Sequence, residues 1–147
     1  MDNKDLGKVF RTMSRLLREL KIGFNPEEGF PLNKTEFITV MELRTYPGMP
    51  MKHYQRAAGI ESGSFTYLAD DLEKKGIARR VTAAVDKRRT ILELTHAGML
   101  MADALTSRAD AHVAEKLSVL TDEQRQRFLS AMAVLEDTLT QLEKQHG

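Results

Sequence analysis

The sequence has no cysteine and no tryptophan among its 147 residues. Without cysteine, the chain can form no disulfide, no thiolate zinc site and no thiol redox switch. It also lacks a long apolar run, since nothing approaches the roughly 20 residues of a membrane span. The amino terminus lacks the apolar core of a signal peptide. We therefore expect a cytoplasmic protein that makes no membrane contact.

Catalytic motifs are absent as well. The sequence contains no G-x-G-x-x-G, P-loop, G-x-S-x-G or H-E-x-x-H pattern, and no nucleophile stands beside a convincing base. The histidines show no metal-ligand spacing and are His53, His96, His112 and His146. We predict that the protein is not an enzyme and has no catalytic residue, metal ion or cofactor.

The chain as a whole has no excess of charge of one sign, but one of its segments is strongly basic. The formal net charge is +1, yet residues 74–89 contain seven Lys or Arg side chains and a single acid, Asp86. This segment therefore has a charge of +6, and the rest of the chain has −5. Such a cluster favours polyanionic phosphate as a partner. A solvated group of charges on a turn is the alternative.

Apolar spacing predicts amphipathic helices near both chain ends. Residues 4–22 have apolar side chains every three or four positions. The last predicted helix has them at spacings of 4, 3, 4 and 3 from Phe128 to Leu142, which is a heptad-like pattern. Two such helices, flanking a central segment, indicate a helical dimerisation lobe.

The central segment has the pattern of a winged helix-turn-helix. Asn33 with Glu36, and later Thr121 with Gln124, form capping boxes that mark helix starts. Gly76 stands where a recognition helix would end. The predicted elements are helices at about 34–45, 51–58, 62–75 and 96–118 and strands at about 77–82 and 90–94. The predicted fold class is mainly α with a small β wing: a winged helix-turn-helix lobe plus a helical dimerisation lobe built from both chain ends.

These motifs give the chain a family resemblance. From about Asn33 to Gly98 it resembles a MarR-type (multiple-antibiotic-resistance regulator) winged helix-turn-helix protein. The matching pieces, in order, are L-N-K-T-E-F, A-G-I, L-A-D-D-L-E-K-K-G-I-A-R-R, D-K-R-R and L-E-L-T-H-A-G. The resemblance implies a homodimer on a pseudo-palindromic double-stranded DNA operator, with recognition helices in major grooves and wings in minor grooves. The predicted segments are 1–32 (dimerisation helix and loop), 33–95 (DNA-binding lobe) and 96–147 (dimerisation helices).

Candidate DNA contacts lie on the recognition helix. Residues near the amino end of such a helix reach base edges, so we predict contacts from Ser62, Ser64, Thr66 and Tyr67. Helix capping is the alternative for the two serines. Lys74 lies on the same predicted outer face and is a further candidate.

The wing supplies the other candidates. A guanidinium at a hairpin tip can enter a narrow minor groove, and this role is predicted for Arg88. Asp86, two residues away, can hold that guanidinium in a bidentate pair. Lys87 and Arg89 are predicted phosphate contacts, which add affinity and salt dependence rather than sequence choice.

Several positions depart from the commoner family pattern. Tyr67 and Asp71 stand where many relatives have Arg, and an Asp facing DNA is repelled by phosphate unless it accepts from cytosine or pairs with an Arg. Tyr54 and Gln55 replace the usual Leu and Ala, and a buried tyrosine needs a polar partner for its hydroxyl. His53 is expected to be solvated.

The chain also suggests an effector. MarR-type proteins often bind small aromatic acids or other lipophiles between their lobes. The resemblance and the adaptable methionines place a candidate pocket near Phe10, Met13, Phe37 and Met41, with ordinary core packing as the alternative.

The predicted function is a ligand-responsive transcriptional repressor. The alternative is a winged-helix protein-interaction module with little or no specific DNA binding.

Overall fold

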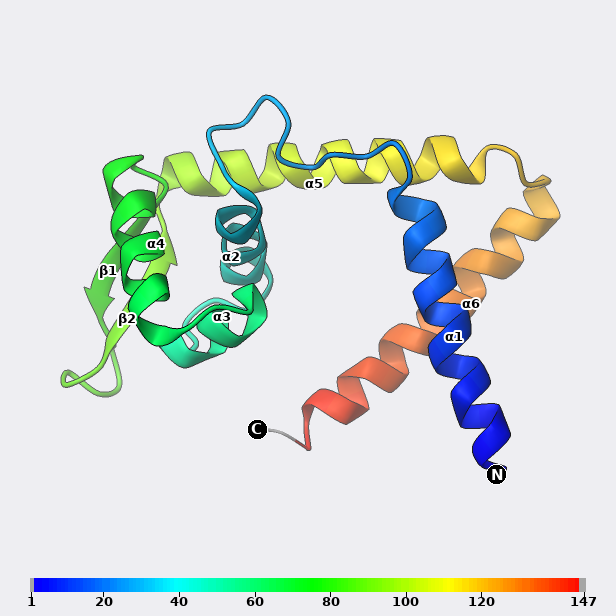
Figure 1. Ribbon diagram of the computed structural model, residues 1–147, viewed down its shortest axis with the longest axis horizontal. Coiled ribbons are helices and arrows are strands. Elements are labelled where there is room, and N and C mark those ends of the chain that lie inside the picture. Colours follow the sequence, from blue (N-terminus) through cyan, green and yellow to red (C-terminus); the bar gives the residue numbers. More distant parts are fainter. Residues whose placement is uncertain (1, 146–147) are drawn as a thin grey trace. The chain divides into compact units, whose positions relative to one another are not determined.

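The computed structural model describes residues 2–145 and shows a mainly helical chain with one β-hairpin (Figure 1). This confirms the predicted fold class. In chain order the elements are α1 Asn3–Lys21, α2 Lys34–Thr45, α3 Met51–Ala58, α4 Ser62–Lys74, β1 Ala78–Thr82, β2 Thr90–Leu94, α5 His96–Leu117 and α6 Asp122–Glu143.

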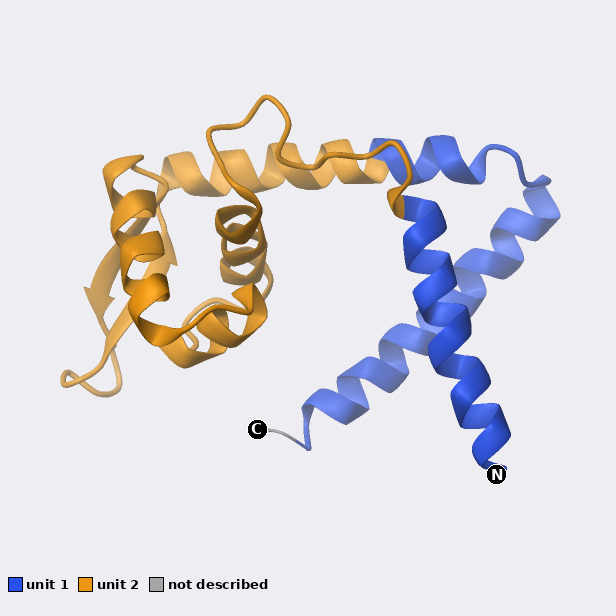
Figure 2. Ribbon diagram, in the orientation of Figure 1, with its two compact units in different colours: residues 1–20, 111–147 blue, residues 21–110 orange. Residues whose placement is uncertain are grey.

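The chain forms two compact units, shown in different colours in Figure 2. One unit comprises residues 21–110, and the other comprises residues 1–20 with residues 111–147. Helix α5 begins in the first unit and ends in the second. The segments 1–32, 33–95 and 96–147 predicted from the sequence divide the chain by function rather than by compactness, and they stay a prediction.

Local signals in the sequence fix where the helices begin and end. The Asn33 side chain accepts from the Glu36 N–H at 2.9 Å, and the Glu36 carboxylate accepts from the Asn33 N–H at 2.8 Å. Thr121 and Gln124 form the same reciprocal pair before α6. Gly76 follows α4 with φ +70°, a left-handed conformation that favours glycine, and ends the helix. These three predictions are confirmed.

The core of the unit at residues 21–110 lies between α2, α3, α4, the hairpin and the first half of α5. Its most buried apolar members are Val40, Leu43, Tyr54, Ala69, Leu72, Ile77, Ala78, Leu92, Ala102 and Leu105. Gly98 on α5 lies so close to the chain entering the hairpin that an added Cβ would be 1.9 Å from the Ile77 carbonyl oxygen. The start of α5 and the start of β1 are therefore in direct backbone contact.

The other unit has a different character. Neither α1 nor α6, both of which the structure describes in full, contains a buried residue. Large apolar side chains instead lie exposed on both helices, Phe10 among them at 78%. The ring of His112 and the carbonyl oxygen of Leu20 lie 2.8 Å apart, which joins α5 to the end of α1. No helix in residues 2–145 is long and apolar enough to cross a membrane.

Candidate nucleic-acid interface

Helix α4 has one buried face and one exposed face. Phe65, Leu68 and Leu72 are buried in the core, as their spacing predicts. The candidate contact residues on the amino-terminal half of α4 are all exposed and comprise Ser62, Ser64, Thr66 and Tyr67. Tyr67 is 74% exposed, so its ring and its hydroxyl, which can donate a hydrogen bond, lie open to solvent.

The serines do not cap this helix. Glu61 is the N-cap residue, and no side chain makes a capping hydrogen bond there. The hydroxyl of Thr66 donates to the carbonyl of Ser62 at 3.2 Å, which leaves its oxygen able to accept from outside. The amino end of α4 therefore presents short hydroxyl side chains together with backbone N–H groups, a combination that suits phosphate oxygens and base edges.

The wing is a regular hairpin. Strands β1 and β2 pair antiparallel from Ala78 opposite Leu94 to Thr82 opposite Thr90. In the connecting loop the Ala83 N–H donates to the Arg89 carbonyl at 2.8 Å. This hydrogen bond closes the loop directly beyond the last strand pair, so residues 84–88 form the tip of the hairpin.

Asp86 has a different role at this tip from the predicted one. Its carboxylate accepts from the backbone N–H of Arg88 at 3.0 Å, and its carbonyl accepts from the N–H of Arg89 at 3.0 Å. No ion pair joins Asp86 to the guanidinium of Arg88 within the part of the chain that the structure describes. The expected bidentate pair is therefore wrong. Asp86 shapes the turn because its short side chain reaches the backbone two residues on, as Asp does in Asx-turns.

Ion pairs divide the seven cations of residues 74–89 into two groups. Lys75 pairs with Glu36 at 2.8 Å, and Arg79 pairs at 2.7 Å with Glu93, its cross-strand neighbour. Arg80 also has acidic partners. The cations without an acidic partner among residues 2–145 are Lys74, Lys87, Arg88 and Arg89. The positive charge available to a ligand is therefore gathered at the wing tip and at the end of α4.

Arg80 joins the wing to the recognition helix. Its guanidinium, from β1, pairs with Asp70 at 2.7 Å and with Glu73, and it donates to the Thr66 carbonyl at 3.3 Å. Partial burial acts to lower the pKa of Arg80, but the hydrogen bonds to Asp70 and Glu73 outweigh it and raise the pKa. The arginine stays charged, and its positive charge lies directly beside the carboxylate of Asp70. Asp71 remains exposed.

A polar cluster holds the connection between α2 and α3. The buried Tyr54 hydroxyl donates to the Tyr46 carbonyl at 2.7 Å and accepts from the Met49 N–H at 3.1 Å. Burial raises the pKa of this phenol. The ring nitrogen Nε2 of His53 lies 2.9 Å from a carboxylate oxygen of Glu42. The expectation that His53 is solvated is therefore wrong, because its ring is partly buried between two tyrosine rings.

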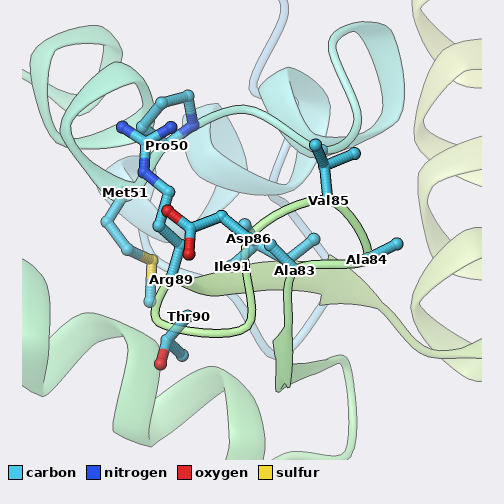
Figure 3. Close-up of a pocket in the computed structure, with 10 residues that line it drawn as sticks. Pro50, Met51, Ala83, Ala84, Val85, Asp86, Arg89, Thr90 and Ile91 are labelled. Carbon is cyan, nitrogen blue, oxygen red and sulfur yellow. The ribbon is translucent and has the colours of Figure 1, made fainter.

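A hollow of about 530 Å³ lies between the wing loop and the start of α3. Figure 3 shows the side chain of Arg89 on its wall, reaching toward Pro50. The lining residues are Gly48, Pro50, Met51, Ala83, Ala84, Val85, Asp86, Arg89, Thr90 and Ile91. None of the four residues predicted for an effector pocket lines this hollow.

The four predicted pocket residues belong to different units. Phe37 and Met41 are partly buried against the core of the unit at residues 21–110. Phe10 and Met13 lie on α1 in the other unit. As for metals, residues 2–145 contain no group of three His, Cys, Asp or Glu side chains that could hold an ion. His146 lies outside the described residues.

A recognition helix with an exposed polar amino end, fixed to a hairpin with a cationic tip, defines a winged helix-turn-helix protein of the DNA-binding class. Residues 32–90 match the MarR family. The chain is 32% identical over 126 residues to the HTH-type transcriptional regulator MhqR of Bacillus subtilis (strain 168), covering 84% of this chain and 86% of that protein. The chain belongs to the MarR family, whose members are transcriptional regulators and not enzymes.

Solved structures show the same fold. A MarR family protein from Bacillus stearothermophilus superposes with a TM-score of 0.74 at 17% identity, over 95% of this chain and 99% of that one. S. aureus MepR bound to ethidium bromide superposes with a TM-score of 0.61 at 21% identity, over 90% and 95% of the two chains.

Proposed function

We propose that this DNA-binding regulator is a homodimeric, ligand-responsive repressor that binds a pseudo-palindromic operator in the cytoplasm. The observation on which the proposal depends is the separation of charges in the unit at residues 21–110. Three cations are held in ion pairs that fix the fold, whereas Lys87, Arg88 and Arg89 at the wing tip have no acidic partner among the described residues. Unpaired cations on a projecting turn suit a phosphate-lined groove.

Each exposed residue has a part in the proposed complex. The amino end of α4 enters the major groove, where Ser62, Ser64, Thr66 and Tyr67 contact bases or phosphates. Lys74 at the other end of the helix contacts the backbone. The wing tip enters the minor groove with Arg88, while Lys87 and Arg89 contact phosphates, and Asp86 fixes the shape of the tip.

The exposed apolar face of α6 supports the homodimer. Met132, Leu135, Leu139 and Leu142 recur at spacings of 3 or 4 residues and are 38–52% exposed, on a helix that buries nothing within its own chain. An exposed apolar face of this kind is typical of a protein–protein interface. A second copy supplies an identical face, and the two recognition helices then meet half-sites about one helical turn apart.

We place the effector of the proposed repressor with Phe10, Met13, Phe37 and Met41. The ethidium complex of MepR supports a lipophilic organic ligand, because it shows such a molecule bound to a protein of the same fold. The ligand lowers operator affinity by favouring a dimer geometry whose recognition helices no longer match the half-sites.

A fluorescence-anisotropy titration on the DNA upstream of the protein's own gene, at several salt concentrations, tests the proposal. We expect binding roughly a thousandfold tighter than to a scrambled duplex. Replacing Arg88 and Arg89 with Ala should weaken operator binding and reduce the slope of log affinity against log salt by about 0.9, because Arg89 is the phosphate contact of the two and each phosphate contact contributes about 0.9.

The control is the double variant Arg79→Ala/Glu93→Ala. It removes an exposed cross-strand ion pair without changing the net charge, so its salt slope should match that of the wild type. An unchanged slope in the Arg88/Arg89 variant would exclude the wing from DNA binding. It would favour a protein-interaction module instead.

A further inference from the structure

Glu36 is a charged side chain in the interior of the unit at residues 21–110. Its side chain is 2% exposed, and one carboxylate oxygen accepts the Asn33 N–H of the capping box. Both carboxylate oxygens accept from the Lys75 ammonium at 2.8 Å. A buried carboxylate is costly unless an opposite charge and hydrogen bonds compensate for the lost water. Here both conditions are met.

The pair joins two distant parts of the chain. Glu36 lies in the first turn of α2, and Lys75 is the C-cap residue of α4. Directly after Lys75, Gly76 turns the chain toward the wing with φ +70°. The ion pair therefore fixes the end of the recognition helix at the point where the wing begins.

Lys75 and its neighbour Lys74 differ in their surroundings. The Lys75 side chain is 36% exposed and points to the buried carboxylate. Lys74 is exposed and has no acidic partner among residues 2–145. If Lys75 turned to a DNA phosphate, Glu36 would keep only the Asn33 N–H as a partner in a site closed to water. That loss would offset the gain from one phosphate contact.

We propose that Glu36 and Lys75 are positioning residues for operator recognition: their ion pair sets the place of α4, and Lys75 does not contact DNA. This inference rests on the proposed DNA-binding function. It predicts that losing the pair reduces sequence discrimination, whereas losing a phosphate contact reduces affinity for every duplex alike.

The test compares Lys75→Met with Lys74→Met on operator and scrambled duplexes across a salt series. For Lys75→Met we expect operator affinity to fall about tenfold, as for one mismatched base pair. Its affinity for the scrambled duplex and its salt slope should stay unchanged. For Lys74→Met we expect equal losses on both duplexes and a slope reduced by about 0.9.

The double variant Glu36→Gln/Lys75→Met controls for a loss of operator affinity that is caused by misfolding. Glutamine keeps an oxygen for the Asn33 N–H and removes the unpaired buried charge, so this variant should unfold at a higher urea concentration than Lys75→Met alone. Its operator affinity should lie within about twofold of that of Lys75→Met, because the two changes disrupt one interaction.

Two results would overturn the positioning role. One is a Lys75→Met variant that behaves like Lys74→Met, which would make Lys75 a phosphate contact. The other is full operator affinity in Lys75→Met. Failure of the proposed function looks different, because the wild type itself would then not distinguish the operator from the scrambled duplex, and the positioning role would fail with it.

Discussion

Replacement of Gly98 by alanine tests whether the wing is anchored as the structure shows. Gly98 lies in the first turn of α5, and its N–H donates to the Thr95 hydroxyl at 3.0 Å. An added Cβ would lie 1.9 Å from the oxygen, 2.9 Å from the carbonyl carbon and 3.3 Å from the Cα of Ile77. These are backbone atoms, which cannot rotate away as a flexible side chain can.

The cost of relieving this clash has two parts. Ordinary van der Waals contact begins near 3.4 Å, so α5 must move away from β1 by more than an ångström. Overpacking of this kind costs about 1–3 kcal/mol. The movement also disturbs the hydrogen bonds that the Ile77 carbonyl accepts from the N–H and hydroxyl of Thr95, at 3.0 and 3.1 Å. Each such bond stabilises by about 1 kcal/mol, so a total loss of roughly 3–5 kcal/mol is expected.

Gly63→Ala is the matched control. Gly63 is exposed in α4, has helical φ, and an added Cβ there meets no atom within 4 Å. This change should stabilise the protein by up to about 1 kcal/mol, because alanine favours a helix. The assay is urea denaturation at one fixed protein concentration, since the proposed dimerisation would make stability depend on concentration. A Gly98→Ala protein as stable as Gly63→Ala would refute the close backbone approach and the anchoring derived from it.

Two further predictions concern Tyr54 and the apolar face of α6. Burial raises the pKa of Tyr54 above 10.0, so the folded protein holds this proton more tightly than the unfolded chain and loses stability as the pH rises above about 10. In urea denaturation, Tyr54→Phe should lose less stability over this pH range than the wild type. An equal loss in the two proteins would contradict the prediction. Leu135→Glu with Leu139→Glu should shift the protein toward monomer in sedimentation experiments, whereas Ser130→Glu on the opposite face of α6 should leave the dimer unchanged.

Most of the fold could be predicted from the sequence because its signals are local. The capping box at Asn33 and Glu36 involves residues three apart, so the motif alone specifies the hydrogen bonds that the structure contains. The buried face of α4 likewise follows from the spacing of Phe65, Leu68 and Leu72. Each of these features depends on helix geometry and needs no knowledge of the rest of the molecule.

The candidate site was less predictable because charge partners are set by tertiary packing. Lys75 and Glu36 are 39 residues apart, and only the packed unit brings them together. From the sequence alone, Lys75 and the wing-tip cations contribute equally to the net charge of +6 over residues 74–89. Asp86 shows the same limit at short range, since its spacing to Arg88 fits both a side-chain pair and the backbone hydrogen bond that the structure contains.

The paired cations bear on how an effector can act. Arg80 ties β1 to Asp70 and Glu73 on α4, and Gly98 places α5 against Ile77 at the start of the wing. The end of α4 is also held through the ion pair of Lys75 with Glu36, so several ion pairs join the recognition helix to the wing and to α2. We therefore expect an effector to leave the internal geometry of each DNA-binding unit unchanged. In the proposed homodimer, the effector would then act on the distance between the DNA-binding units of the two copies, which sets whether both recognition helices reach their half-sites together.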